Sequence, residues 1–109
     1  LQMLKYETVF VNDPTLTEEE NEEIIRMVDE IVTSEGGTVH KIERWGKRRL
    51  AYPINKKDAG YYLVVECVAS GGALDELERQ LRLADDVVRH KLIRLPDAEA
   101  ERRGMAVSA

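Results

Sequence analysis

The sequence has one cysteine, three prolines and few aromatic residues, and it has no long apolar run. The lone cysteine, Cys67, cannot form an internal disulfide, which favours a reducing, cytoplasmic setting. Because no run of about 18 apolar residues occurs, the sequence predicts no membrane-spanning helix. The chain has 109 residues, of which 43% are hydrophobic and 34% are charged, so we expect one soluble globular domain.

The sequence also lacks the residue patterns on which catalytic and metal sites depend. His40 and His90 lie on different predicted strands, with no other ligand at zinc-binding spacing. Cys67 falls in an apolar strand, where a cysteine usually packs as a small hydrophobic residue. Gly71 and Gly72 precede a helix but lack the lysine of a phosphate-binding loop. We therefore expect neither enzymatic activity nor a cofactor or bound metal.

The spacing of apolar residues predicts four strands and two helices. The strands are expected over residues 4–11, 38–44, 61–68 and 87–95, and the helices over 17–35 and from 70–72 to about 84. The third strand is the most apolar and is placed centrally, and the imperfect period of the second strand allows a bulge before Gly46 ends it. The order β-α-β-β-α-β predicts an α+β, ferredoxin-like split-βαβ sandwich with a four-stranded antiparallel sheet.

Each predicted helix has a single apolar stripe, so both are expected to cover the same face of the sheet. Residues 3–95 form the predicted domain. Residues 96–109, which are short of large apolar side chains, are expected to form a mobile tail. Strand alternation then leaves the following residues on the uncovered face: Lys5, Glu7, Val9, Val11, Tyr62, Val64 and Glu66. An exposed apolar patch of this kind usually marks a protein partner, and the alternative is an apolar face in contact with solvent alone.

The charge of the chain is unevenly distributed. Residues 41–57 hold seven basic residues and one acidic residue, a net charge of +6, whereas the whole chain has a net charge of −5. Within this stretch, WGKRRLAYPINKK combines five basic residues with Trp45 and Tyr52. Lysine and arginine neutralise phosphates, so the cluster predicts contact with a nucleic acid, whereas the remaining acidity is expected on the helix side. The alternative is a solvated hairpin whose aromatic residues pack at the edge of the core, which is the more frequent role of such residues.

Three other functions are possible for a domain with this predicted fold. The third strand, GYYLVVEC, lacks the leading basic residue and alternating aromatics of an RNA-recognition motif, which disfavours base stacking on the sheet. The loop at residues 12–15 has neither arginine nor glycine, which disfavours an acyl-phosphate hydrolase. A small-ligand-binding or regulatory module remains an alternative, and it requires a formed pocket.

The stretch GKRRLAYPIN at residues 46–55 resembles the signature of the bacterial small-subunit ribosomal protein six family. KYE at 5–7, GYY at 60–62 and the run from Leu81 to Val87 match that family in order and spacing, so the resemblance covers about residues 3–95. It implies a non-catalytic protein of the cytoplasmic ribosome. It also implies binding to the central domain of 16S ribosomal RNA, together with the eighteenth small-subunit protein as a heterodimer.

The resemblance also implies roles for individual residues. It assigns RNA contacts to Lys5, Arg48, Arg49 and Arg89, and the partner-facing sheet surface to Tyr62 and Val64. Together with the charge cluster and strand alternation, the predicted RNA-binding residues are Lys5, Lys47, Arg48, Arg49, Lys56, Lys57, Arg89 and Lys91. The predicted partner-binding residues are Glu7, Val9, Tyr62 and Val64.

Overall fold

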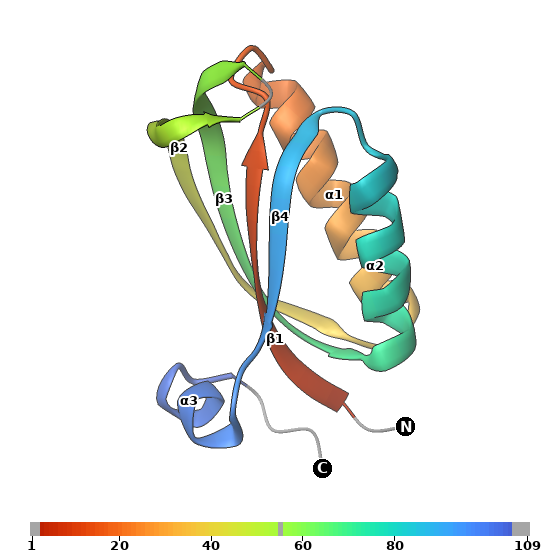
Figure 1. The fold of residues 1–109 in the computed structure, drawn as a ribbon. Coiled ribbons are helices and arrows are strands. Elements are labelled where there is room, and N and C mark those ends of the chain that lie inside the picture. The colour runs from red at the N-terminus through yellow and green to blue at the C-terminus, as the bar shows by residue number, and fades with distance from the viewer. Residues whose placement is uncertain (1–2, 55, 106–109) are drawn as a thin grey trace.

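The computed structural model describes residues 3–54 and 56–105, which form one four-stranded sheet and three helices (Figure 1). In chain order the elements are β1 (Met3–Asn12), α1 (Glu18–Ser34), β2 (Thr38–Ile54), β3 (Lys57–Ser70), α2 (Gly71–Leu83), β4 (Val87–Arg94) and α3 (Asp97–Arg102). Through β4 this is the predicted order, and the α+β, ferredoxin-like fold is confirmed. No helix in the described part of the chain is long and apolar enough to cross a membrane.

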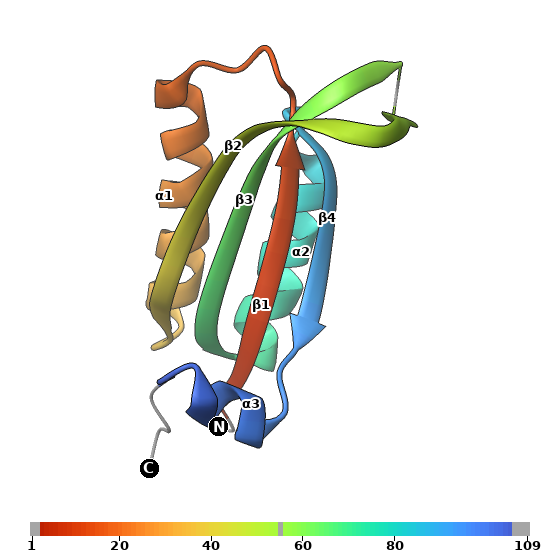
Figure 2. The same ribbon diagram turned by 90° about the vertical axis from the view of Figure 1, so that its left-hand side faces the viewer.

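The sheet is antiparallel, with strand order β2-β3-β1-β4, so β3 is central as predicted. β1 and β3 pair in one continuous register along their overlap. Both α1 and α2 lie against the same face of the sheet (Figures 1 and 2), which confirms the expectation from their single apolar stripes. We call the opposite face of the sheet the open face; by strand alternation it carries Glu7, Val9, Tyr62, Val64 and Glu66.

The main core lies between the sheet and the two long helices. It is built mainly from Phe10, Leu63, Val65 and Cys67 of the sheet and from Ile24, Ile25, Val28, Val32, Leu74, Leu77 and Leu81 of the helices. Cys67 is completely buried, as expected for a cysteine that packs as a hydrophobic residue. Burial raises the pKa of its thiol to about 11, so the group is uncharged and unreactive at neutral pH.

The N-terminus of α1 follows directly from the local sequence. The Thr17 hydroxyl accepts a hydrogen bond from the Glu20 amide at 3.1 Å, and the Glu20 carboxylate accepts one from the Thr17 amide at 3.0 Å. α1 holds seven acidic residues and one basic residue, and α2 holds three acidic and two basic residues. The helix layer therefore carries much of the negative charge of the chain, as predicted.

β2 is longer than the sequence predicted. We expected Gly46 to end the strand, but Gly46 adopts a φ of 80°, the register shifts between Arg44 and Gly46, and the strand continues to Ile54. A glycine in the left-handed region accommodates a β-bulge, which bends a strand without ending it. The bulge that the imperfect period of residues 38–44 allowed is present as a second register shift, between Val39 and Lys41, and β2 and β3 together form a long hairpin.

The prediction of a mobile tail over 96–109 is wrong for residues 97–105, and residues 106–109 lie outside the described part of the chain. Asp97–Arg102 form α3, which lies on the open-face side of the sheet, away from α1 and α2 (Figures 1 and 2). A second, small apolar cluster fixes it, formed by Val68, Leu95, Ala100 and Met105. The tail was expected to be mobile because it has few large apolar side chains, but Ala100 and Met105 are sufficient to complete this small cluster.

Candidate functional site

The β2–β3 hairpin extends beyond the rest of the sheet. β1 ends at Asn12, opposite Tyr61, so among the described strands residues 57–60 of β3 pair with β2 alone. Figure 2 shows this two-stranded segment projecting past the ends of β1 and β4. We call residues 47–60 the hairpin arm. Lys56 near its tip has a φ of 65°, the left-handed conformation that two-residue hairpin loops favour.

Basic side chains line the hairpin arm and remain exposed. They are Lys47, Arg48, Arg49 and Lys56, whereas the side chain of Lys57 lies outside the described residues. No ion pair of the described residues involves these four side chains. The Arg48 guanidinium lies 5.7 Å from the centre of the Trp45 ring, a cation–π distance that restricts its motion without neutralising its charge.

The base of the same hairpin behaves differently. Lys41 pairs with Glu43 at 2.9 Å, and Arg44 donates two hydrogen bonds to Glu22 of α1, at 2.7 and 2.8 Å. The hydrogen bonds from Arg44 lower the pKa of the Glu22 carboxyl below its usual value of 4.5. The cationic cluster of the sequence is therefore divided into a neutralised base and an arm whose four described cations form no ion pair, a division that the sequence alone did not reveal.

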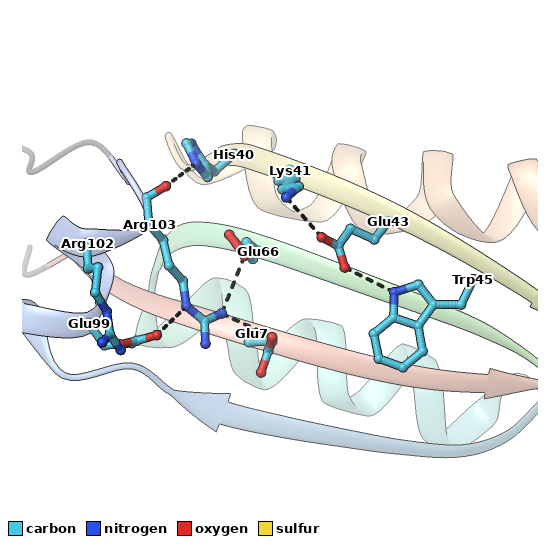
Figure 3. Close-up of polar contacts among 9 residues, drawn as sticks. All are labelled: Glu7, His40, Lys41, Glu43, Trp45, Glu66, Glu99, Arg102 and Arg103. Carbon is cyan, nitrogen blue, oxygen red and sulfur yellow. Dashed lines mark hydrogen bonds and ion pairs between the residues drawn. The ribbon is translucent and has the colours of Figure 1, made fainter.

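The two aromatic residues of the cluster have different partners. Trp45 stacks on Tyr62 of β3, with ring centres 6.2 Å apart and planes 14° apart, and its indole N–H donates to Glu43 at 3.0 Å (Figure 3). This arrangement makes Trp45 a packing residue of the open face, although about half of it remains exposed. Tyr52 is an exposed residue of the arm, and its hydroxyl accepts a hydrogen bond from Arg89 of β4 at 3.1 Å, which raises the pKa of Arg89.

The predicted partner residues are contiguous on the open face. Val9 and Val64 lie directly opposite each other on the central strands, and Tyr62 lies two residues before Val64 on β3. Val64 is only 4% exposed, so the centre of this face is already packed and Tyr62 is its more accessible aromatic residue. Because directly paired residues share a face, Arg89 opposite Val11 and Lys91 opposite Val9 also lie here. Two predicted RNA contacts are therefore beside the predicted partner surface.

Lys5 and Glu7 lie at the other end of β1, under α3. Lys5 is buried, and its ammonium is 3.5 Å from Asp97 at the start of α3. A phosphate cannot reach Lys5 while α3 is in this position, so the structure gives no support to its predicted RNA contact. Glu7 and Glu66 both accept from the Arg103 guanidinium, at 3.1 and 3.4 Å (Figure 3).

Sequence reasoning missed Arg103, because it treated the segment after Pro96 as unstructured. A signal was nevertheless present. Pro96 and Asp97 provide a helix start, Glu99 precedes Arg102 and Arg103 at helical spacing, and Gly104 with a φ of 75° provides the stop.

The alternative of a small-ligand module requires a formed cavity. The hollows found among the described residues have volumes of about 280 and 230 Å³. One is lined by Arg94 to Asp97, and the other lies on the hairpin arm between Arg49 and Asp58. Both are smaller than the roughly 300–1,000 Å³ of typical ligand pockets, so neither is the formed pocket that the small-ligand alternative requires.

Comparison with known proteins agrees with this geometry. A family model described as Ribosomal protein S6 matches residues 5–94. Small ribosomal subunit protein bS6 of Carboxydothermus hydrogenoformans is 47% identical over 90 residues, which cover 83% of this chain and 94% of that protein. The bS6 protein of Fusobacterium nucleatum is 39% identical over 92 residues, which cover 84% and 98% respectively. The crystal structure of 30S ribosomal protein S6 from Thermotoga maritima matches with a TM-score of 0.83 and 33% identity, over 94% of this chain and 97% of that chain.

The match to the family model runs from Lys5 in β1 to Arg94, the last residue of β4, so it includes nearly all of the sheet, α1 and α2 but not α3. The family resemblance seen in the sequence is thereby confirmed, as is the expectation that the protein is not an enzyme. The chain belongs to the ribosomal protein S6 family, whose members are structural proteins of the small ribosomal subunit.

Proposed function

We propose that this protein binds the central domain of 16S ribosomal RNA as a heterodimer with the eighteenth small-subunit protein. The hairpin arm contacts RNA phosphates, and the open face around Tyr62 contacts the partner. The observation that carries this proposal is the set of unpaired cations, Lys47, Arg48, Arg49 and Lys56, on an arm that projects from an acidic body.

The distribution of charge explains how a chain with a net charge of −5 approaches a polyanion. The molecule is 44 Å long, whereas charges are screened over about 8 Å at physiological ionic strength. The second half of α1 runs away from the arm toward the opposite end of the sheet (Figure 2), so its exposed acids, Asp29 and Glu30, weaken the attraction between the arm and a phosphate very little. Counterion release by the arm supplies affinity, and the partner supplies additional contacts.

The open face suits a protein partner better than it suits RNA bases. Val9, Val64 and the Trp45–Tyr62 stack form an apolar surface, and the indole and phenol rings are packed against each other. Arg89 and Lys91 border this surface on β4, so RNA that follows the arm would meet both the arm and the edge of the heterodimer. Adjacent RNA and partner surfaces account for binding as a pair.

The proposal is tested by removing two positive charges from either of two places on the protein. Arg48→Gln with Arg49→Gln takes two cations from the arm, and Arg79→Gln with Arg82→Gln takes two from α2, so both variants have a net charge of −7. Filter binding measures the affinity of each for a central-domain RNA fragment with the partner present. Each lost phosphate contact should lower the slope of log affinity against log salt by about 0.7–0.9.

The arm variant should therefore lose up to about 1.4–1.8 in slope, and the α2 variant should match the wild type. Equal weakening by both variants would show that net charge, and not the arm, governs binding. An unchanged slope for the arm variant would contradict the assignment of Arg48 and Arg49 to phosphates. A wild-type protein that binds neither RNA nor partner would refute the proposed function as a whole.

A further inference from the structure

α3 covers one end of the sheet face that the proposed function assigns to the partner. Figures 2 and 3 show it beside the start of β1, with the Arg103 side chain reaching over β1 and β3. The backbone carbonyl of Arg103 also lies 3.2 Å from the His40 ring nitrogen of β2. The contacts of residues 97–105 thus extend over three strands of the open face.

Arg103 neutralises an acid pair that is unfavourable by itself. Glu7 and Glu66 lie directly opposite each other on the central strands, with side chains only 23% and 11% exposed. Like charges in this arrangement destabilise a sheet, and poor hydration increases the cost. The Arg103 guanidinium contacts both carboxylates and is itself held by Glu99 at 2.8 Å. A cation is therefore needed at this position whenever the face is covered.

The attachment of α3 is nevertheless slight compared with that of the other helices. α3 has six residues, whereas isolated helices shorter than about 12–15 residues are marginal in water. Its apolar contacts form a small cluster that is separate from the main core. α3 contributes Ala100 to this cluster, and the residues that follow α3 contribute Met105. The Lys5–Asp97 pair adds little, because Asp97 is exposed. Release of residues 97–105 would leave the main core intact.

We propose that α3 is a built-in competitor for the protein partner, in which Arg103 occupies the position that a cationic side chain of the partner takes in the heterodimer. This inference rests on the proposed function. Charge complementarity identifies the occupant: once α3 leaves, Glu7 and Glu66 require a new cation, so the segment of the partner that replaces α3 carries a basic side chain. The free protein thereby keeps its acid pair neutralised, and partner binding must displace α3.

Two variants loosen α3 at independent anchors. Arg103→Gln removes the guanidinium, and Met105→Ser weakens the apolar cluster without touching the carboxylates. Arg102→Gln is the matched control, because Arg102 is 77% exposed and its ion pair among the described residues is with Glu99. Calorimetry of each protein with the partner gives the affinities, and circular dichroism confirms that each variant is folded.

Both loosened variants should bind the partner about 3–10-fold more tightly than the wild type, and the control should stay within about 2-fold. Hydrogen exchange should be faster for residues 97–105 in the wild-type complex than in the free protein. Unchanged or weaker binding by the loosened variants, or slower exchange of α3 in the complex, would overturn the inference while leaving heterodimer formation established. Absence of binding by the wild type and by both loosened variants would instead refute the proposed function, and the inference with it.

Discussion

Replacement of Tyr62 by alanine separates the contribution of the open face to folding from its contribution to partner binding. Tyr62 is half-buried and stacks on Trp45. An aromatic pair contributes about 0.5–1.5 kcal/mol beyond its buried area, so with the lost apolar contact we expect a cost of about 1–3 kcal/mol. Domains of this size are stable by about 5–15 kcal/mol, so the variant should remain folded.

The cost to the heterodimer should be larger in relative terms. Truncation of an aromatic residue at the centre of an interface typically costs 2 kcal/mol or more, which corresponds to about 30-fold in affinity. An aspartate at Val64 would be a poorer test, because Val64 is 4% exposed and a buried carboxyl shifts its pKa by as much as 3–5 units. That shift corresponds to about 4–7 kcal/mol, which is enough to unfold the domain and hide any effect on binding.

Thermal denaturation and calorimetry with the partner measure the two quantities separately. Leu83→Ala is the control, because Leu83 is 65% exposed at the end of α2, in the helix layer, and should affect neither quantity. A folded Tyr62→Ala protein that binds the partner with wild-type affinity would refute the assignment of the open face to the partner. Equal weakening by Leu83→Ala would show that the effect is not specific to that face.

Three further predictions concern single groups. Because Arg44 lowers the pKa of Glu22, their pair stabilises the folded protein fully above the unfolded pKa of about 4.5, and this stabilisation is lost as the pH falls through the folded pKa. Arg44→Gln should therefore lower the free energy of unfolding by up to about 1 kcal/mol near pH 7. In urea denaturation the difference between the variant and the wild type should shrink at acid pH, and a difference that persists unchanged would contradict the pairing. Since the pKa of Cys67 is raised to about 11, thiol reagents near pH 8 should react at least about 100-fold more slowly with the folded than with the unfolded protein. Rapid stoichiometric labelling of the folded protein would contradict the burial of Cys67. A Cβ at position 60 would lie 2.3 Å from Val11 Cγ1, so Gly60→Ala should lower stability by about 1–3 kcal/mol, and an unchanged melting temperature would contradict the close packing of β1 and β3.

The fold could be predicted largely from local patterns, because those patterns agree with the tertiary packing. Leu63, Val65 and Cys67 face the helices as strand alternation predicts, and the Thr17–Glu20 pattern forms the expected capping box. The continuation of β2 past Gly46 could not be read from the sequence, since a glycine in a strand suits both an end and a bulge.

The candidate site was predicted less completely, because its properties depend on contacts between distant residues. The charge cluster indicated the hairpin arm, but not the pairing of Arg44 with Glu22 of α1. The alternation of β1 placed Lys5 on the open face, but not beneath Asp97 of a helix about 90 residues later. Contacts between residues that are far apart in the sequence cannot be predicted from helix and strand propensities or from the distribution of charge.

Site-specific photocrosslinking within assembled small subunits tests the central claim most directly. A photoreactive amino acid at Lys47, an exposed position of the hairpin arm, is compared with the same group at Leu83, an exposed position at the end of α2. The account predicts crosslinks from position 47 to the central domain of 16S ribosomal RNA and none from position 83. Crosslinks to RNA from position 83 but not from position 47 would contradict it.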